Sequence, residues 1–171
     1  MGCHFGMEDC LFLTGGSTLG LHAALALFCR PGDQVLIDRG CHRAVYNALA
    51  LLDLEPVYLP RPWRAGEGIA GPISPQDVEN LLDSHPNIKT ICITSPTYSG
   101  VLSDVAVTSH LIHARGGKLI VDGARGSPAV FGCGRLLRLR RLICSAHKTL
   151  PALGQSALLF TNGVDPRRVR R

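Results

Sequence analysis

The stretch at residues 118–126 reads KLIVDGARG. Three aliphatic residues form a short apolar run, which ends at the carboxylate Asp122 and a glycine turn. Continuous apolar runs bounded by turn residues are typical of strands that are buried on both faces of a parallel sheet. In such sheets ligands bind beyond the carboxyl ends of the strands, so the polar residues after each run are the candidates for function.

The same pattern recurs along the chain and predicts the fold class. Strands are expected at residues 11–13, 34–38, 56–60, 90–94, 118–122, 141–144 and 156–160. Helices are expected at 19–29, 44–52, 74–84 and from about residue 104 to the Gly116-Gly117 pair, and residues 61–73 read as a loop rich in Pro and Gly. Strands that alternate with helices predict an α/β fold, a three-layer α/β/α arrangement around a mostly parallel seven-stranded sheet.

The composition is that of one globular domain. The 171 residues are 46% hydrophobic and 18% charged, which excludes a disordered or low-complexity chain. No apolar run is long enough to span a membrane and no signal peptide is apparent, so we expect a cytoplasmic protein without a membrane partner. The cysteine count is odd, at 7, and no CxxC pair occurs, which favours a reducing compartment over disulfides or a metal site.

The net charge of +5 comes largely from two late groups of arginines. These are Arg135, Arg138, Arg140 and Arg141, followed by Arg167, Arg168, Arg170 and Arg171. Such a cluster is a weak signal for nucleic-acid binding, and no aromatic platform accompanies it. A solvated surface is the favoured interpretation, and we expect no nucleic-acid partner.

A glycine turn, Thr14-Gly15-Gly16-Ser17-Thr18, leads into the first expected helix. Glycines let the backbone approach a ligand closely, and the free N–H groups of a helix start attract an anion. Ser17 and Thr18 add hydroxyl donors. The turn matches neither the P-loop nor the G-x-G-x-x-G pattern, and taken alone it is better explained as a purely structural turn with a serine N-cap.

Three further residues follow strand ends, and each has a plain structural alternative. Asp122 can hold a cation or a protonated ring nitrogen, or simply cap a turn. Lys148 can attack a carbonyl, or lie on the surface. His42 can stack on a flat ligand, or be an ordinary loop histidine. Together, an anion cradle, a carboxylate, a lysine and a flat ring match the phosphate, pyridine nitrogen, aldehyde and ring of pyridoxal 5′-phosphate (PLP).

The chain resembles the major domain of the Orn/Lys/Arg decarboxylase family, PLP enzymes of the aspartate-aminotransferase fold. The matching segments are FLTGGSTLGLHAAL at 12–25, RPGDQVLIDRGCHRAV at 30–45, TSPTYSGVLSD at 94–104, KLIVDGARG at 118–126 and SAHKTLPALGQSALLF at 145–160. They occur in the family's order and span nearly the whole chain. SAHKTLPAL is the most specific of them and the glycine turn is the least.

This resemblance implies the decarboxylation of lysine, arginine or ornithine, with a role for each site residue. Lys148 would form the internal aldimine with PLP, Asp122 would keep the pyridine nitrogen protonated, and His42 would stack on the ring. The implied phosphate contacts are Gly15, Gly16, Ser17 and Thr18, with Ser145 and His147 as a second set.

The chain also departs from the family pattern. Arg125 stands where many members have a histidine, which indicates a change in substrate or in tuning. The family's enzymes have segments before this domain and a small domain after it, so we expect residues 1–171 to be a single, partial PLP-binding major domain without these two parts. The domain face that they would cover leads us to expect a homodimer or larger homo-oligomer. Another PLP reaction, an aminotransferase or a carbon–sulfur lyase, and a truncated non-catalytic homologue remain as alternatives.

Overall fold

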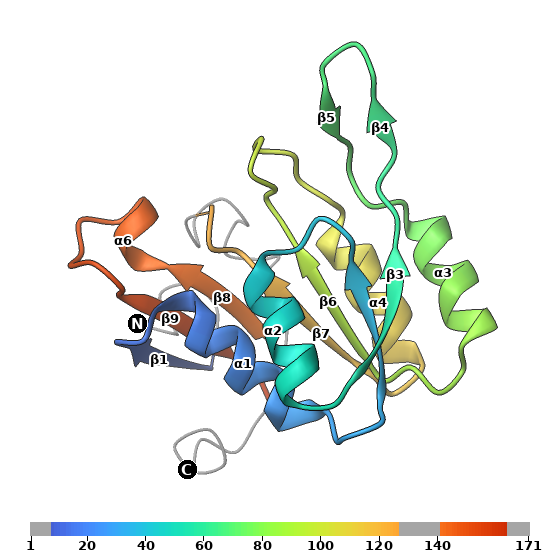
Figure 1. Ribbon diagram of the computed structural model, residues 1–171, viewed down its shortest axis with the longest axis horizontal. Helices are drawn as coiled ribbons and strands as arrows, with labels where there is room; N and C mark the ends of the chain where they lie inside the picture. The colour runs from blue at the N-terminus through green and yellow to red at the C-terminus, as the bar shows by residue number, and fades with distance from the viewer. Residues whose placement is uncertain (1–7, 127–140, 164–171) are drawn as a thin grey trace.

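The computed structural model describes residues 8–126 and 141–163 (Figure 1). The strands are β1 (Asp9–Leu13), β2 (Gln34–Asp38), β3 (Glu55–Leu59), β4 (Trp63–Arg64), β5 (Ile69–Ala70), β6 (Thr90–Thr94), β7 (Lys118–Asp122), β8 (Arg141–Ser145) and β9 (Ala157–Thr161). The helices are α1 (Gly16–Phe28), α2 (Arg43–Leu51), α3 (Pro75–Ser84), α4 (Val105–Ala114) and α6 (Ala146–Thr149). Apart from the β8 backbone at Arg141, both late arginine groups lie outside the described residues.

One seven-stranded sheet forms the centre of the molecule, in the order β1-β9-β8-β7-β6-β2-β3. From β8 to β3 all neighbouring strands are parallel. β9 alone runs against its neighbours β8 and β1. The expected mostly parallel seven-stranded sheet is therefore confirmed.

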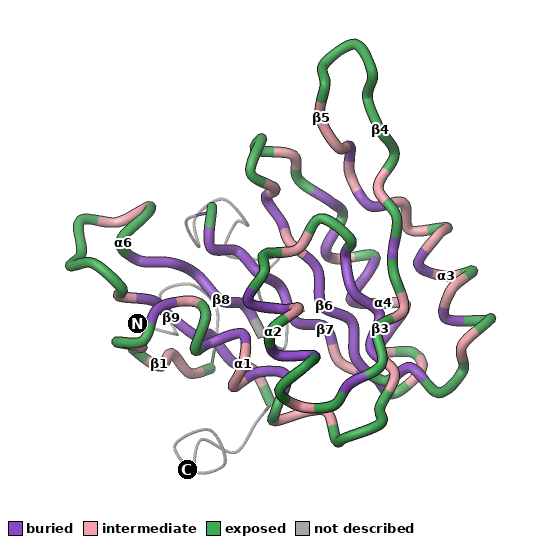
Figure 2. The backbone as a smooth tube through the Cα atoms, viewed as in Figure 1, coloured by how far each residue is buried: buried purple, intermediate pink, exposed green. Residues whose placement is uncertain are grey.

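Helices cover both faces of this sheet, and its inner strands are buried, whereas the edge strands β1 and β3 are in large part accessible (Figure 2). Val35 and Ile37 point to one face, where they share a core cluster with Leu25 of α1. Leu36 points to the other face, where it shares a cluster with Leu82 of α3. Burial on both faces explains why the strands read as unbroken apolar runs, and it confirms the three-layer arrangement.

Two local predictions differ from the structure. Residues 61–73 are not entirely a loop, because β4 and β5 pair there as an antiparallel hairpin that projects from the body of the molecule (Figure 1). The short helix α6 was also not predicted. Elements this short carry too few residues for either the alternation of a strand or the periodicity of a helix to appear in the sequence.

The helix starts show where capping was and was not predictable. α3 begins as expected, with Pro75 in its first turn and the Ser74 hydroxyl accepting from Asp77 N at 3.4 Å. At α1 the expected serine N-cap is wrong, because the cap is Gly15 and the helix begins at Gly16. Ser17 thus lies inside the first turn, and no side chain caps the free N–H groups of α1.

Two other features bear on the predicted setting. The described cysteines are all free thiols. Among the helices in the described parts of the chain, none combines the length and the apolar character needed to cross a membrane.

The order of the strands changes direction between β2 and β6. β3 lies on the outer side of β2, whereas β7 and β8 follow on the far side of β6. At such a switch point the loops after neighbouring strands separate, and a crevice opens at the carboxyl ends. The sheet therefore positions a site between the loops after β2, β6 and β7.

Candidate active site

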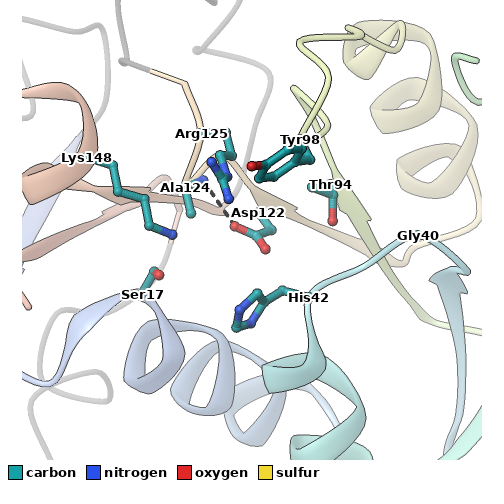
Figure 3. A pocket seen from close by; sticks show the side chains of 9 residues that line it. All are labelled: Ser17, Gly40, His42, Thr94, Tyr98, Asp122, Ala124, Arg125 and Lys148. Atoms are coloured by element: carbon teal, nitrogen blue, oxygen red, sulfur yellow. Dashed lines mark hydrogen bonds between the residues drawn. The ribbon is translucent and has the colours of Figure 1, made fainter. Parts of the chain in front are cut away.

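A pocket lies at this switch point, and nine residues line it (Figure 3). They are Ser17, Gly40, His42, Thr94, Tyr98, Asp122, Ala124, Arg125 and Lys148. The lining comes from the start of α1, the ends of β2, β6 and β7, and helix α6. The parallel strands bring these distant segments together because their carboxyl ends lie along one edge of the sheet. Of the predicted site residues, the pocket unites Ser17, His42, Asp122 and Lys148.

The remaining predicted residues do not line the pocket. Gly15, Gly16 and Thr18 flank Ser17 at the start of α1. Ser145 is fully buried, and its hydroxyl lies 3.2 Å from Nδ1 of His147. The same nitrogen lies 3.2 Å from the carbonyl oxygen of Ser156. Ser145 and His147 thus brace the turn that carries Lys148.

Asp122 is the buried charge of the site. Its residue surface is only 3% exposed, and one carboxylate oxygen, Oδ1, accepts a hydrogen bond from Ala124 N at 3.0 Å. Burial raises the pKa of this carboxyl above its ordinary value, and the Ala124 N–H and the charges of His42 and Lys148 offset that effect only in part. Within the described residues Oδ2 has no hydrogen-bond partner. A cationic donor in the pocket would therefore stabilise the ionised carboxylate.

His42 and Lys148 approach Asp122 from different elements. His42 caps helix α2, where its Nδ1 accepts from Ala44 N at 3.2 Å, so its ring is held at the edge of the pocket. This cap is not among the roles that the sequence suggests for His42, which are a stacking ring or an ordinary loop histidine. Lys148 is an exposed residue of α6, and its amine points into the pocket toward Asp122 and Ser17 (Figure 3).

The start of α1 supplies an anion-attracting corner. Gly16 has a φ of +75°, a conformation that residues with a Cβ rarely adopt. No side chain caps the 13-residue helix α1, so its first backbone N–H groups and the positive end of its dipole lie beside Ser17. This arrangement suits a phosphate or a carboxylate.

Sequence reasoning missed the hydroxyl of Thr94. The sequence places this residue at a strand end and in the matching segment 94–104 but suggests no role for it, yet it lines the pocket. Its Oγ1 is buried, and no hydrogen-bond partner for it occurs in the part of the chain that the structure describes. A buried polar atom without a partner at the edge of a pocket indicates a place where a bound ligand can supply one.

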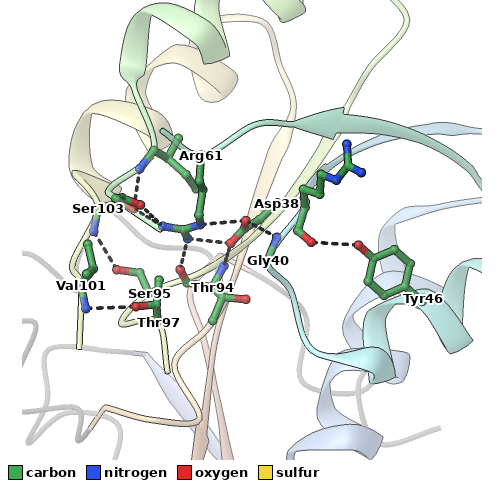
Figure 4. A network of polar contacts seen from close by, with 12 residues as sticks. Asp38, Gly40, Tyr46, Arg61, Thr94, Ser95, Thr97, Val101 and Ser103 are labelled. Carbon is green, nitrogen blue, oxygen red and sulfur yellow. Dashed lines mark hydrogen bonds and ion pairs between the residues drawn. The ribbon is translucent and has the colours of Figure 1, made fainter. Parts of the chain in front are cut away.

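Sequence reasoning also missed Arg61, which belongs to a network of polar contacts that includes the pocket residues Thr94 and Gly40 (Figure 4). It follows β3, in the region expected to be an irregular loop. Its Nη2 donates to the carbonyl oxygen of Thr94 at 2.6 Å, and its guanidinium pairs with Asp38. Asp38 in turn accepts from Gly40 N at 2.8 Å. Arg61 therefore connects two segments of the pocket wall.

Comparisons with known proteins agree with this fold. A curated relative, the uncharacterized protein YaaO of Bacillus subtilis, is 30% identical over 92% of this chain and 34% of its own length. An arginine decarboxylase of Halalkalibacterium halodurans is 26% identical over 71% of this chain and 25% of its own length. The solved constitutive lysine decarboxylase of E. coli aligns with a TM-score of 0.81 at 22% identity, over 98% of this chain and 26% of that one.

The chain thus spans about a third or less of the length of these relatives. The family model that describes the major domain of the Orn/Lys/Arg decarboxylases matches residues 2–169. Because this match covers almost the entire chain, the protein belongs to the Orn/Lys/Arg decarboxylase family.

Proposed function

We propose that this chain is the cofactor-binding part of a PLP-dependent decarboxylase that acts on lysine, arginine or ornithine. Membership of the family and the likeness to an arginine decarboxylase support the reaction class. The observation that carries the proposal is the buried Asp122, which faces the amine of Lys148 across one pocket.

The residues present fit the chemical groups of PLP. The ε-amine of Lys148 would hold the cofactor covalently at its aldehyde, and Asp122 would accept from the protonated pyridine nitrogen. His42 would lie against the ring, and the α1 start with Ser17 would bind the phosphate. The fit is chemical, because burial raises the pKa of the Asp122 carboxyl and a protonated ring nitrogen beside it would favour its ionised form.

When bound, PLP supplies an electron sink for the bond between Cα and the carboxylate of the substrate. The chain's own residues maintain the conditions for that chemistry. Asp122, shielded from water, stabilises a positive charge at a ring nitrogen more strongly than an exposed carboxylate does. His42 keeps its orientation through its cap to Ala44 N. The amine of Lys148, which points into the same pocket, would return a proton to Cα of the substrate.

A direct test is covalent capture of the cofactor. The purified chain is mixed with PLP, its visible absorbance is recorded, and the complex is reduced with borohydride and mapped by peptide mass spectrometry. We expect an absorbance band and a label on Lys148, both absent from Lys148→Ala. Lys89→Ala, which removes an exposed lysine bonded to Arg115 O, should keep both. No band in the wild-type chain would overturn the proposal in favour of a non-catalytic homologue.

Product analysis separates decarboxylation from the other PLP reactions. Lysine, arginine and ornithine are each incubated with the loaded protein, and carbon dioxide, amines and keto acids are measured. Release of carbon dioxide with the matching amine supports the proposal. A keto acid product would instead support an aminotransferase, and cleavage at a carbon–sulfur bond would support a lyase of that type.

We also propose that the protein is a cytoplasmic homodimer or larger homo-oligomer. Phe12, with 71% of its surface exposed, lines an apolar groove together with Leu150 and Pro151. Exposed apolar patches of this kind are typical of contacts between subunits. Sedimentation at several protein concentrations tests the assembly, and a monomer at all of them would contradict it.

A further inference from the structure

Arg125 and Tyr98 form a stacked pair in the wall of the pocket (Figure 3). The guanidinium carbon of Arg125 lies 4.0 Å from the centroid of the Tyr98 ring. Arg125 follows the end of β7, and Tyr98 lies in the loop after β6. The pair therefore joins the loops after two neighbouring strands, above the carboxylate of Asp122.

The stacking leaves the hydrogen-bonding edge of Arg125 available. An aromatic ring covers one flat face of a guanidinium, whereas its N–H groups point outward in the plane. Arg61 and Arg115 form ion pairs with Asp38 and Asp83. No described carboxylate pairs with Arg125 in the same way. Its charge is thus held in place and open to a ligand.

The charges of the pocket favour the binding of an anion beside Arg125. Lys148 and Arg125 are cations, and Asp122 is the one carboxylate among the nine lining residues. Ser17, at the start of α1, lies on the opposite side of the pocket from Arg125 (Figure 3). The pocket therefore has two separate places that attract anions, and a phosphate at α1 leaves the one at Arg125 open.

We propose that Arg125 binds the α-carboxylate of the amino-acid substrate and that Tyr98 is the positioning residue that holds its guanidinium. This inference rests on the proposed function. The α-carboxylate is the one anionic group that lysine, arginine and ornithine have in common. A guanidinium binds it through two parallel hydrogen bonds, with a charge that does not depend on pH, which a histidine in this position cannot match.

The role has a kinetic signature. Carbon dioxide carries no charge, so an ion pair to the leaving carboxylate stabilises the bound substrate at least as much as the transition state. Loss of Arg125 should therefore raise KM and leave kcat unchanged or higher. A merely structural role for Arg125 would lower kcat together with the content of bound PLP.

The experiment compares ligands that differ by the carboxylate alone. Dissociation constants of lysine and of its decarboxylated counterpart, cadaverine, are measured on the PLP-loaded protein from the change in visible absorbance. In Arg125→Gln we expect lysine to bind more weakly while cadaverine binding stays the same. The ratio of the cadaverine dissociation constant to the lysine dissociation constant should then fall about tenfold, as expected for the loss of a hydrogen bond to a charged group. Arg125→Lys and Tyr98→Leu should give smaller falls, and Tyr98→Phe should keep the ratio.

Arg64→Gln is the matched control, because it removes an exposed arginine that is paired with Glu67 on the hairpin. It should leave the ratio unchanged. An unchanged ratio in Arg125→Gln, with the PLP band intact, overturns this inference and leaves the proposed function standing. A band missing from the wild-type chain overturns both. A tenfold loss of PLP affinity in Arg125→Gln would assign Arg125 to the cofactor's phosphate and also overturn the inference.

Discussion

Arg61 Nη2 and Asp38 Oδ2 lie 2.6 Å apart in the interior, where the two side chains are 4% and 0% exposed. A second hydrogen bond, from Nε to Oδ1 at 2.8 Å, makes the pair bidentate. Asp38 also accepts from the backbone N–H groups of Gly40 and Thr94, and both residues line the pocket. The ion pair therefore holds the ends of β2 and β6 in a fixed relation.

Removing Arg61 should destabilise the fold strongly. Arg61→Met keeps much of the apolar volume but leaves Asp38 as a buried charge without its partner, which costs about 3–5 kcal/mol. The free energy of unfolding in urea measures this loss. Arg64→Met is the control, because its pair with Glu67 is half exposed and contributes less than about 1 kcal/mol. Equal losses in the two variants would contradict a special role for the buried pair.

Gly117 is a second position where the structure predicts a large effect from a small change. A Cβ added there would lie 2.8 Å from the carbonyl oxygen of Lys89 and 2.5 Å from Cδ1 of Ile112. Gly117→Ala should therefore cost roughly 1–3 kcal/mol of unfolding free energy through overpacking. Gly66→Ala is the control, because nothing lies within 4 Å of its added Cβ and its change should be close to zero. A Gly117→Ala chain as stable as wild type would show that the β7 start adjusts freely.

The strands and the site residues at their ends could be predicted because one physical cause produces both. Burial on two faces requires unbroken apolar runs, and the first polar residue after each run must lie at the open edge of the sheet. Asp122 and His42 were found in this way. Lys148 was found from its place after β8, although the short helix that carries it was not.

Arg61 could not be found by the same reasoning. It lies in a segment rich in Pro and Gly, and its partner Asp38 comes from a different strand, so no local pattern connects them. The Tyr98–Arg125 stack depends likewise on two loops meeting in space. The prediction of a serine cap at α1 was wrong for a local reason. Serine is a common N-cap residue, but Ser17 lies inside the helix instead of before it.

Ser17 should affect ligand binding far more than stability. No side chain caps α1, so Ser17→Ala removes no cap and should change the free energy of unfolding by less than about 0.5 kcal/mol. If the start of α1 binds the phosphate of PLP, loss of the hydroxyl should weaken PLP binding about tenfold, as expected for a hydrogen bond to a charged group. Absorbance titration measures the affinity, and Ser84→Ala, which removes an exposed serine hydroxyl of α3 outside the pocket lining, is the control. Equal affinities of Ser17→Ala and wild type would place the phosphate elsewhere.

Asp122 should make the stability of the empty protein decrease as the pH rises. Burial raises the pKa of its carboxyl in the folded chain above the ordinary value of 3.8, so the folded state binds this proton more tightly than the unfolded state. Between the two pKa values the unfolded state holds fewer protons, and the free energy of unfolding falls as the pH increases through that window. Above the raised pKa the destabilisation is complete and constant.

Asp122→Asn isolates this effect, because the amide oxygen can still accept from Ala124 N but carries no charge. Urea unfolding of both proteins is measured at a series of pH values. As the pH rises above 3.8, the free energy of unfolding of the variant should increase relative to that of the wild type, up to a plateau. Added PLP should stabilise the wild type more than the variant, because a protonated ring nitrogen favours the ionised carboxylate that only the wild type has. The wild type should therefore show the larger rise in thermal stability when PLP is added. A stability difference that stays flat across this range, or equal stabilisation of both proteins by PLP, would refute the role of Asp122 as the buried partner of the cofactor's nitrogen.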